Sequence, residues 1–378
     1  MQMSIPRSSR LLGLDLLRFF AAFSVMNFHL GFWSWVTPKT TPASIINGAI
    51  AYPELTPFAW WGRFGVDIFF VISGFVIAYS ADRATPASFA SGRALRLLPG
   101  AFICASLTFV VAAAIGYAPI SALFASYLRS ISLTLFGPWI DGVYWTLGIE
   151  IVFYALVFVL LVANWLKHIE WLALGLCTLT LLRYGFPTFL FQPDPFSAHG
   201  ITDRWADLLM LHHGAAFAVG IMIFTGESKG WSIFRALILV MSVLTGFMAV
   251  YSTAAWMLRG LAVGQPASVA AVIWLTSIGW IFFSIRMQGR IDQALNPKIT
   301  SAINRLGLAT YPLYLVHDLI GATFLGIMVK FGISRYAALI ATELLMIAAC
   351  MTIILAAEEW LRQAVRVISS HCMKVAIR

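Results

Sequence analysis

Three ionisable residues lie inside the first long apolar segment of this chain. Residues 11–30 read LLGLDLLRFFAAFSVMNFHL and contain Asp15, Arg18 and His29, although about 20 apolar residues suffice to cross a bilayer. An ionisable side chain at such a depth costs roughly 2.5–3.5 kcal/mol or more, so it usually marks a functional site. Eleven residues are close to three helical turns, which places Arg18 and His29 on one helix face about 16 Å apart. Asp15 lies one turn before Arg18 on the same stripe.

Two residues in the apolar segments, a histidine and a glutamate, are suited to proton transfer. His29 is a candidate general base or nucleophile, because imidazole titrates near neutral pH. Glu150, in the apolar segment YWTLGIEIVFY, has its ionised form disfavoured unless it is paired. His29 is its natural partner if both lie at the same depth. The alternatives are a histidine hydrogen-bonded at a helix end and a structural ion pair between spans; for Glu150 we favour function.

Two arginines later in the chain have the spacing of an anion-binding site. Arg93 and Arg96, in FASGRALRLLP, are one turn apart and form a two-pronged pair suited to phosphates. From spacing alone, ordinary positive charge at the end of a span explains them better. Arg18 either forms a buried pair with Asp15 or faces a polar tunnel, and the sequence leaves both interpretations open.

The segment GRFGVDIFFVISGF, residues 62–75, combines glycines with polar groups in an apolar run. Gly62 and Gly65 permit a tight bend or a close approach of another backbone. Ser73 and Gly74 indicate close helix packing, a kink or a backbone that lines a cavity. Ser73 is not in the sequence context of a hydrolase nucleophile.

Later in the chain, histidines and aspartates occur close together. One group comprises His199, Asp203, Asp207, His212 and His213. A metal site is conceivable there, but we favour a solvated loop and helix start, and we expect no metal.

The sequence offers two further candidates for the substrate cavity. His317, followed by Asp318 in ATYPLYLVHDLIG, either lines the same cavity as His29 or belongs to a packed polar pair. Trp145 is one of several tryptophans that we place near the outer surface of the membrane, where an aromatic belt is the favoured interpretation and a stacking surface for sugar rings is the alternative.

The composition indicates which elements must position these residues. The chain is 60% hydrophobic and 11% charged, whereas soluble domains have about 25% charged residues. We predict an all-α integral membrane protein, one domain over residues 1–378, with about ten transmembrane helices in one bundle. The expected spans are 12–32, 64–79, 97–117, 144–166, 171–182, 206–224, 231–251, 261–285, 306–328 and 336–357, and 120–136 is expected to be interfacial or re-entrant.

The distribution of positive charge orients these spans. The net charge is +9, and because the basic residues sit at the ends of apolar runs, we exclude nucleic acid as a partner. With the N-terminus inside, the inner segments carry about twice as many Lys and Arg residues as the outer ones, which favours both termini in the cytoplasm. Arg18 then lies in the inner half, His29 and Glu150 lie near the outer face, and Arg93 and Arg96 lie at the cytoplasmic mouth.

In their order along the chain, these segments resemble the membrane acyltransferase-3 family, the polytopic O-acyltransferases of bacterial surface glycans. The matching segments are LDLLRFFAAFSVMNFH, GRFGVDIFFVISGF, FASGRALRLLP, YWTLGIEIVFY and LGLATYPLYLVH, which ends at His317. The resemblance implies transfer of an acyl group, usually acetyl from cytoplasmic acetyl-CoA, to a hydroxyl. It also implies that Arg18 and His29 are the essential pair and that Arg93 and Arg96 handle the acyl donor. Many members carry an additional C-terminal SGNH-type domain, which we expect this chain to lack.

The resulting hypothesis is transfer from acetyl-CoA or another acyl-CoA to a hydroxyl of an extracytoplasmic carbohydrate, at the inner membrane of a bacterium and in contact with its lipid. We assign His29, Glu150 and Arg18 to catalysis, Arg93 and Arg96 to the donor, and Asp15, Ser73, Trp145 and His317 to the substrate cavity. Direct transfer is preferred over an acyl-histidine relay. The acceptor, the acyl length and the oligomeric state stay open. The alternative is a secondary transporter of a sugar or lipid-linked substrate, which predicts inverted repeats that the sequence does not show.

Overall fold

The computed structural model describes residues 11–376 except 39, 47–49, 186–200, 260 and 262–263, and it describes side chains up to Leu355 apart from these gaps and residues 201–203. Within this part of the chain the regular structure is helical and there is no strand, which confirms the expected all-α class. Helices dominate because each satisfies its own backbone hydrogen bonds, as lipid requires.

The helical elements follow one another with short connections. In chain order they are α1 (Leu12–Asn27), the π-helix η1 (Phe28–Trp33), α2 (Ser34–Val36), α3 (Thr41–Ile46), η2 (Pro53–Leu55), α4 (Thr56–Ala59), η3 (Trp60–Phe64), α5 (Gly65–Ala81), α6 (Pro86–Ala114), α7 (Ile120–Ile131), η4 (Gly142–Tyr144), α8 (Trp145–Val162), η5 (Leu166–His168), α9 (Ile169–Gly185), α10 (Ile201–Leu208), α11 (Gly214–Lys229), α12 (Ile233–Met257), α13 (Ser268–Ala294), α14 (Pro297–Val316), α15 (Leu319–Lys330) and α16 (Arg335–Ala376).

Several of these elements are long and apolar enough to cross a membrane. Seven described spans meet that criterion, and the bent pair α14–α15, with an angle of 77° at its break, brings the number to eight. The protein is therefore a multi-pass membrane protein. Helix α9 contains the expected span 171–182, and α11 overlaps the expected span 206–224 from Gly214 onward. These helices have only 17 and 16 residues, or about 25 Å at 1.5 Å per residue. The number ten, the location of the termini and the interfacial or re-entrant placement of 120–136 stay predictions. The 12-residue α7 forms the first part of that segment.

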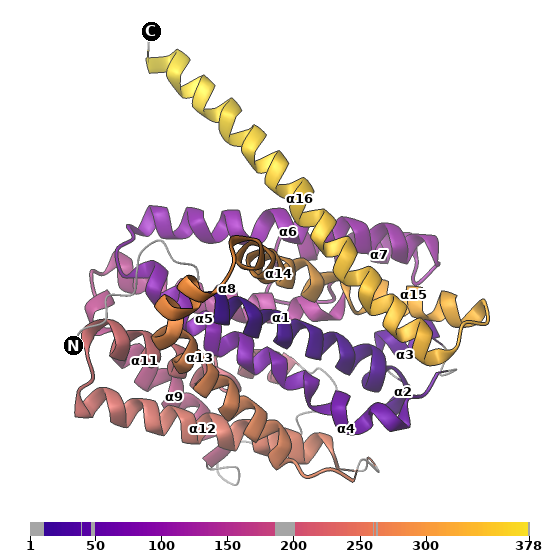
Figure 1. Ribbon diagram of the computed structural model, residues 1–378, viewed down its shortest axis with the longest axis horizontal. Coiled ribbons are helices and arrows are strands. Elements are labelled where there is room, and N and C mark those ends of the chain that lie inside the picture. The colour runs from indigo at the N-terminus through magenta and orange to yellow at the C-terminus, as the bar shows by residue number, and fades with distance from the viewer. Residues whose placement is uncertain are drawn as a thin grey trace.

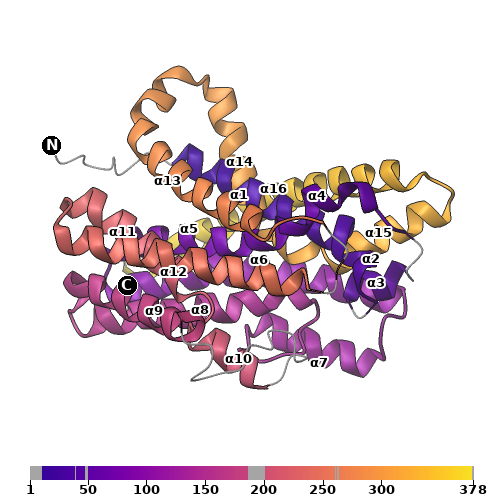
Figure 2. The ribbon, with the colours of Figure 1, turned by 90° about the horizontal axis from the view of Figure 1, so that it is seen from below.

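The long helices lie side by side in one bundle (Figure 1), and the junction of α13 and α14 projects from it as an arch (Figure 2). The outward face of α12 shows how the bundle meets lipid. Leu237, Val240 and Leu244 recur at helical spacing and are more than half exposed, which gives an apolar stripe on the surface.

Helix α5 is a central element because glycines allow other helices to approach its backbone closely. A Cβ atom at Gly62, just before α5, would lie 2.0 Å from the carbonyl oxygen of Ser24, on α1. A Cβ atom at Gly74 would lie 2.2 Å from the carbonyl oxygen of Phe217, on α11. These glycines therefore serve close packing of helices, one of the interpretations that the sequence left open.

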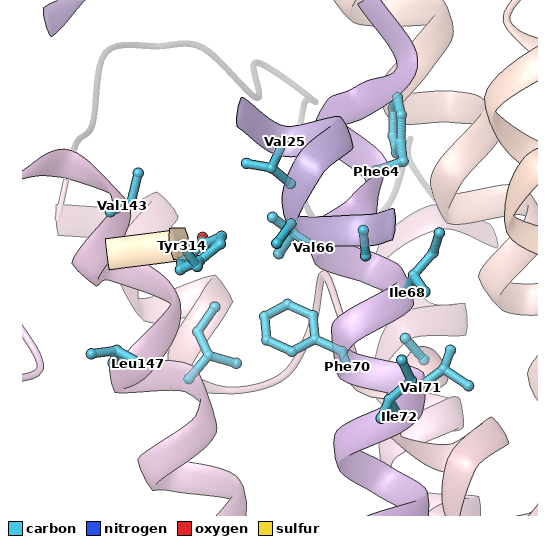
Figure 3. Packing of buried hydrophobic residues seen from close by; sticks show 14 of the residues in the cluster. Val25, Phe64, Val66, Ile68, Phe70, Val71, Ile72, Val143, Leu147 and Tyr314 are labelled. Atoms are coloured by element: carbon cyan, nitrogen blue, oxygen red, sulfur yellow. The ribbon is translucent and has the colours of Figure 1, made fainter. Parts of the chain in front are cut away.

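Apolar side chains fill the space between α5 and α8. Figure 3 shows Phe70 and Val66 of α5 on one side, Val143 and Leu147 on the other, and Tyr314 of α14 between them. All five are buried. This packing fixes the relative positions of three of the helices that carry the candidate site.

Candidate active site

His29 lies in a π-helical segment. Helix α1 continues without a break into η1, which runs from Phe28 to Trp33. Single π-helical turns inside α-helices are rare and occur frequently at functional sites, because the wider turn changes the direction of a side chain. The hydropathy pattern of the segment contains no signal for this feature.

The imidazole of His29 is hydrogen-bonded to that of His317. Nδ1 of His29 lies 2.7 Å from Nε2 of His317, and Nδ1 of His317 lies 3.1 Å from the carbonyl oxygen of Leu313. A carbonyl oxygen only accepts, so Nδ1 of His317 carries a hydrogen and its Nε2 is an acceptor. Nδ1 of His29 must therefore donate to His317. Nε2 of His29 is left with its lone pair, in the state of a general base.

His317 is positioned by the break between α14 and α15. It is the last residue before Asp318, at the point where the two helices bend by 77°. Asp141 holds this break, because its Oδ2 accepts from the backbone N–H of Leu319 at 3.0 Å and its Oδ1 accepts from that of Val143 at 3.2 Å. The Asp318 carboxyl is a hydrogen-bonding neighbour of Asp141. Our sequence analysis missed Asp141, whose only signal is an acid directly before an apolar run.

Glu150 has other partners than the expected one. Its Oε1 accepts hydrogen bonds from the hydroxyls of Tyr154, at 2.6 Å, and Ser73, at 2.9 Å. The expected hydrogen bond between Glu150 and His29 is not formed among the described residues. The physical reason is that His317 already occupies Nδ1 of His29, while two hydroxyls satisfy the carboxylate.

Arg93 lies next to this carboxylate group. Its guanidinium carbon is 5.9 Å from the ring centre of Tyr154 and 5.8 Å from that of Phe89. Nε and Nη1 are buried and have no hydrogen-bond partner in the described part of the chain. The side chain of Tyr154 therefore lies between Arg93 and Glu150. Arg96, one turn later, is exposed.

Arg18 forms a pair with Asp15, one of the two interpretations that the sequence left open. Nη1 of Arg18 lies 3.0 Å from Oδ1 of Asp15, and Asp15 packs so closely on Gly307 that a Cβ there would lie 2.6 Å from its carboxyl carbon. The charges that act most strongly on Arg18, besides Asp15, are those of Arg96 and Glu150. Arg18 is therefore paired with Asp15 and lies within electrostatic range of Arg96 and Glu150, whereas a polar tunnel beside it stays a prediction.

A third polar group surrounds His213, at the start of α11. Its Nδ1 lies 3.0 Å from Oδ1 of Asp67, on α5, and its ring centre is 5.7 Å from that of Trp145. Asp67 and His213 are buried, so a solvated loop is the wrong interpretation for this part of the segment. His199 and the side chain of Asp203 lie outside the described residues.

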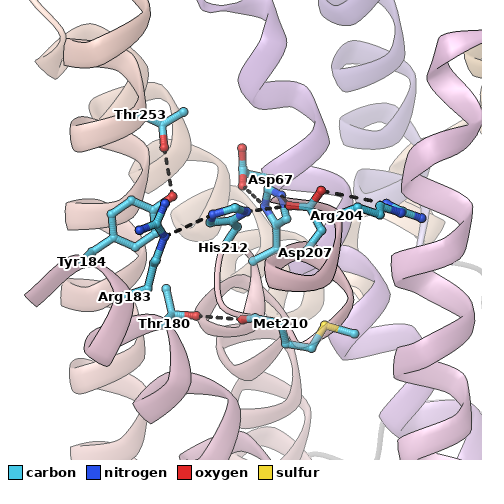
Figure 4. Close-up of polar contacts among 10 residues, drawn as sticks. Asp67, Thr180, Arg183, Tyr184, Arg204, Asp207, Met210, His212 and Thr253 are labelled. Atoms are coloured by element: carbon cyan, nitrogen blue, oxygen red, sulfur yellow. Dashed lines mark hydrogen bonds and ion pairs between the residues drawn. The ribbon is translucent and has the colours of Figure 1, made fainter. Parts of the chain in front are cut away.

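Asp207 connects this group to neighbouring charges (Figure 4). One oxygen, Oδ1, lies 2.6 Å from Nδ1 of His212, and the other, Oδ2, lies 3.9 Å from Nη1 of Arg204. Burial opposes the ionisation of Asp207, but the hydrogen bond from His212 and the neighbouring positive charges outweigh it, so the pKa of this carboxyl is lowered.

The possible metal ligands in this group are Asp207, His212 and His213, whose ligand atoms lie within 4.8 Å of one another. Nε of Arg183 donates to Nε2 of His212 at 3.3 Å. Nδ1 of His212 must then carry the hydrogen and donate to Asp207, and a protonated nitrogen does not ligate a metal. In the described structure these side chains take part in a hydrogen-bonded network that includes Arg183, and the absence of a metal stays a prediction.

The described fold and its buried polar groups define a multi-pass helical membrane protein with an imidazole pair and a charged interior. A family model described as "Acyltransferase domain" matches residues 11–358, so the chain belongs to the acyltransferase-3 family. The match confirms the resemblance, and the protein is a membrane acyltransferase. No curated protein and no solved structure matches the chain.

Proposed function

We propose that this membrane acyltransferase moves an acyl group, acetyl above all, from cytoplasmic acyl-CoA to a hydroxyl of an extracytoplasmic carbohydrate. The single observation that carries the proposal is the hydrogen-bond chain from Leu313 through His317 to His29. It leaves Nε2 of His29 as a base, which acyl transfer to a hydroxyl requires. The secondary transporter needs no such base, and family membership favours the acyltransferase.

The reaction uses His29 as a proton shuttle. Nε2 removes the proton of the acceptor hydroxyl while the hydroxyl oxygen bonds to the acyl carbon. As the carbon–sulfur bond of the donor breaks, the imidazolium returns the proton to the departing sulfur. His317 accepts from Nδ1 throughout, so it keeps Nε2 directed at the reacting oxygen and shares the positive charge, as the orienting group of a catalytic triad does.

The charged group around Glu150 is suited to an anionic acyl donor. Arg93 has two buried donor atoms without a hydrogen-bond partner among the described residues, and Arg96 is exposed beside it. Such guanidinium groups bind phosphate. An acyl-CoA would supply the activated thioester. Glu150 and Asp15 offset part of the positive charge of Arg18 and Arg93, which keeps the group from being purely cationic when no donor is bound.

We propose the cytoplasmic membrane of a bacterium as the location, with both termini inside. Arg18 then lies nearer the donor side than His29 does, and α1 connects the two. Surface glycans analysed by mass spectrometry from cells with and without the gene test the proposal. We expect loss of acyl substituents without the gene, restoration by the wild-type gene and no restoration by His29→Ala. An unchanged glycan would contradict the proposal.

A further inference from the structure

The guanidinium of Arg204, on α10, is held in one orientation. Its Nε donates to the carbonyl oxygen of Leu135 at 2.7 Å, and its carbon lies 5.1 Å from the ring centre of Trp139. The side chain is 12% exposed. A carbonyl acceptor and an aromatic ring therefore fix the plane of the group.

Arg204 fits into a notch that a glycine leaves open. A Cβ atom at Gly148, on α8, would lie 2.2 Å from Nη2 of Arg204. An alanine at that position would displace the guanidinium without removing its charge. Two residues earlier, Thr146 is a neighbour of Tyr314, whose ring centre is 5.7 Å from that of His317. The first turn of α8 thus contacts both Arg204 and the element that carries His317.

The two terminal nitrogens of the Arg204 guanidinium lack hydrogen-bond partners among the described residues. Nη1 and Nη2 are buried, and neither makes a hydrogen bond within the described chain. Among the described residues, the carboxylate oxygen that pairs with this arginine is Oδ2 of Asp207, 3.9 Å from Nη1, which is an ion pair but too long for a hydrogen bond. The other oxygen of Asp207 is occupied by His212. Buried donors without partners are unusual in native proteins and call for an explanation.

We infer that Arg204 binds an anionic group, a carboxylate or a phosphate, on the acceptor of the acyl transfer. The inference rests on the proposed function. Two oxygens of a carboxylate or of a phosphate match the fork of an arginine with two parallel hydrogen bonds. The aromatic rings of Phe136 and Trp205 lie beside this position, with centres 5.1 Å apart, and both are more than one-third exposed. They offer a stacking surface for the sugar that carries the anionic group.

Binding of three matched probes tests the inference. The probes are cellotetraose, its C6-carboxylated form and its C6-phosphorylated form, titrated without acyl donor into the full-length protein in lipid nanodiscs. We expect the wild type to bind one acidic probe about tenfold or more tightly than the neutral probe, a difference of about 1.4 kcal/mol. A preference for the carboxylated or the phosphorylated probe identifies which anion is bound.

Two variants and one control complete the test. Arg204→Gln should abolish the preference, and Gly148→Ala should weaken it while the charge remains. Binding of the neutral probe reports whether each variant is folded. Arg335→Gln is the control, because Arg335 pairs with Glu54 instead, and it should keep the preference. Equal binding of all probes by the wild type, absence of binding, or a preference unchanged in Arg204→Gln overturns the inference. Because no acyl donor is used, such a result leaves the proposed transfer reaction standing.

Discussion

The Nδ1 atom of His29 lies 2.7 Å from Nε2 of His317, and this contact defines the protonation state of both rings. His317 donates its own Nδ1 hydrogen to Leu313, so the acceptor role of its Nε2 is fixed. The two histidines are 288 residues apart in sequence. In the mechanism that we propose, this relationship makes His29 the base and His317 the residue that positions it.

Replacing His317 should lower the rate of transfer more than it changes substrate binding. In His317→Ala, Nδ1 of His29 loses its acceptor and the ring can adopt the wrong tautomer. We expect kcat to fall by about 10²-fold, since general base catalysis contributes roughly 10²–10⁴-fold, with KM for both substrates nearly unchanged. His317→Gln, whose side-chain carbonyl can accept from His29, should recover part of the rate. Equal loss in both variants would contradict the positioning role.

Removal of the hydroxyl of Tyr154 should weaken the hydrogen bonding that holds the carboxylate of Glu150 in place. Tyr154→Phe deletes the 2.6 Å hydrogen bond to the carboxylate, and a hydrogen bond to a charged group contributes about 1.5–3 kcal/mol. We expect a loss of about that size in transition-state stabilisation, measured as kcat/KM. Tyr127→Phe serves as the control, since its hydroxyl contacts only Ser106 among the described residues and should have little effect. A fully active Tyr154→Phe enzyme would separate this hydroxyl from the reaction.

The donor assignment predicts a loss of acyl-CoA affinity in Arg93→Ala/Arg96→Ala. Each phosphate contact of this kind is charge-assisted, so we expect Kd to rise by more than about tenfold and to become less sensitive to salt. Binding of a radiolabelled acyl-CoA to protein in nanodiscs measures this. Arg305→Ala, which removes another positive charge outside this group, is the control. An unchanged Kd in the double variant would remove both arginines from the donor site.

Asp141 should stabilise the break between α14 and α15. Asp141→Asn retains the shape but replaces one carboxylate oxygen by a donor that cannot accept from a backbone N–H, and leaving a buried group unsatisfied costs about 1–3 kcal/mol. We expect a lower Tm and a lower kcat, because His317 directly precedes the bend. Thermal unfolding followed by tryptophan fluorescence checks the first effect. An unaltered Tm would show that Asp141 does not hold the break.

The close approach of α5 to α1 predicts different outcomes at two glycines. Gly62→Ala would place Cβ 2.0 Å from the backbone oxygen of Ser24, whereas a Cβ at Gly175 would have no neighbour within 4 Å. Gly62→Ala should destabilise the protein by about 1–3 kcal/mol, as overpacking does, and Gly175→Ala should not. Comparing the amounts of folded protein after detergent extraction at increasing temperature distinguishes them. Equal stability of the two variants would contradict the packing described for α5.

The sequence predicted the class of fold because long apolar runs specify spans and cannot be mistaken for soluble helices. It also placed Arg18 and Asp15 on one helix face, since three residues on a helix determine their proximity, but it left open whether they pair, as they do in the structure. The partner of His29 could not be predicted in this way. Glu150 and His317 both lie at plausible depths, and only the bend between α14 and α15 brings His317 within hydrogen-bond distance.

The local sequence was also insufficient to predict the burial and the partners of His213. Asp67 precedes it by 146 residues, and hydropathy reports the average environment of a segment rather than the direction of a side chain. The segment 199–213 resembles a solvated loop and helix start because three histidines and two aspartates occur in it, yet the close packing of α5 on α11 buries His213 against Asp67. The interpretation as solvated residues failed for this reason.

The most direct measurement of the central claim uses sealed vesicles that contain the protein, with labelled acetyl-CoA on the side of the α1 N-terminus and a glycan acceptor on the other. Transfer of label to the glycan is compared between the wild type and His29→Ala, with acyl-CoA binding measured in parallel. We predict that His29→Ala binds acyl-CoA normally and transfers label more than about 10²-fold more slowly. Transfer at the wild-type rate by His29→Ala would contradict the account.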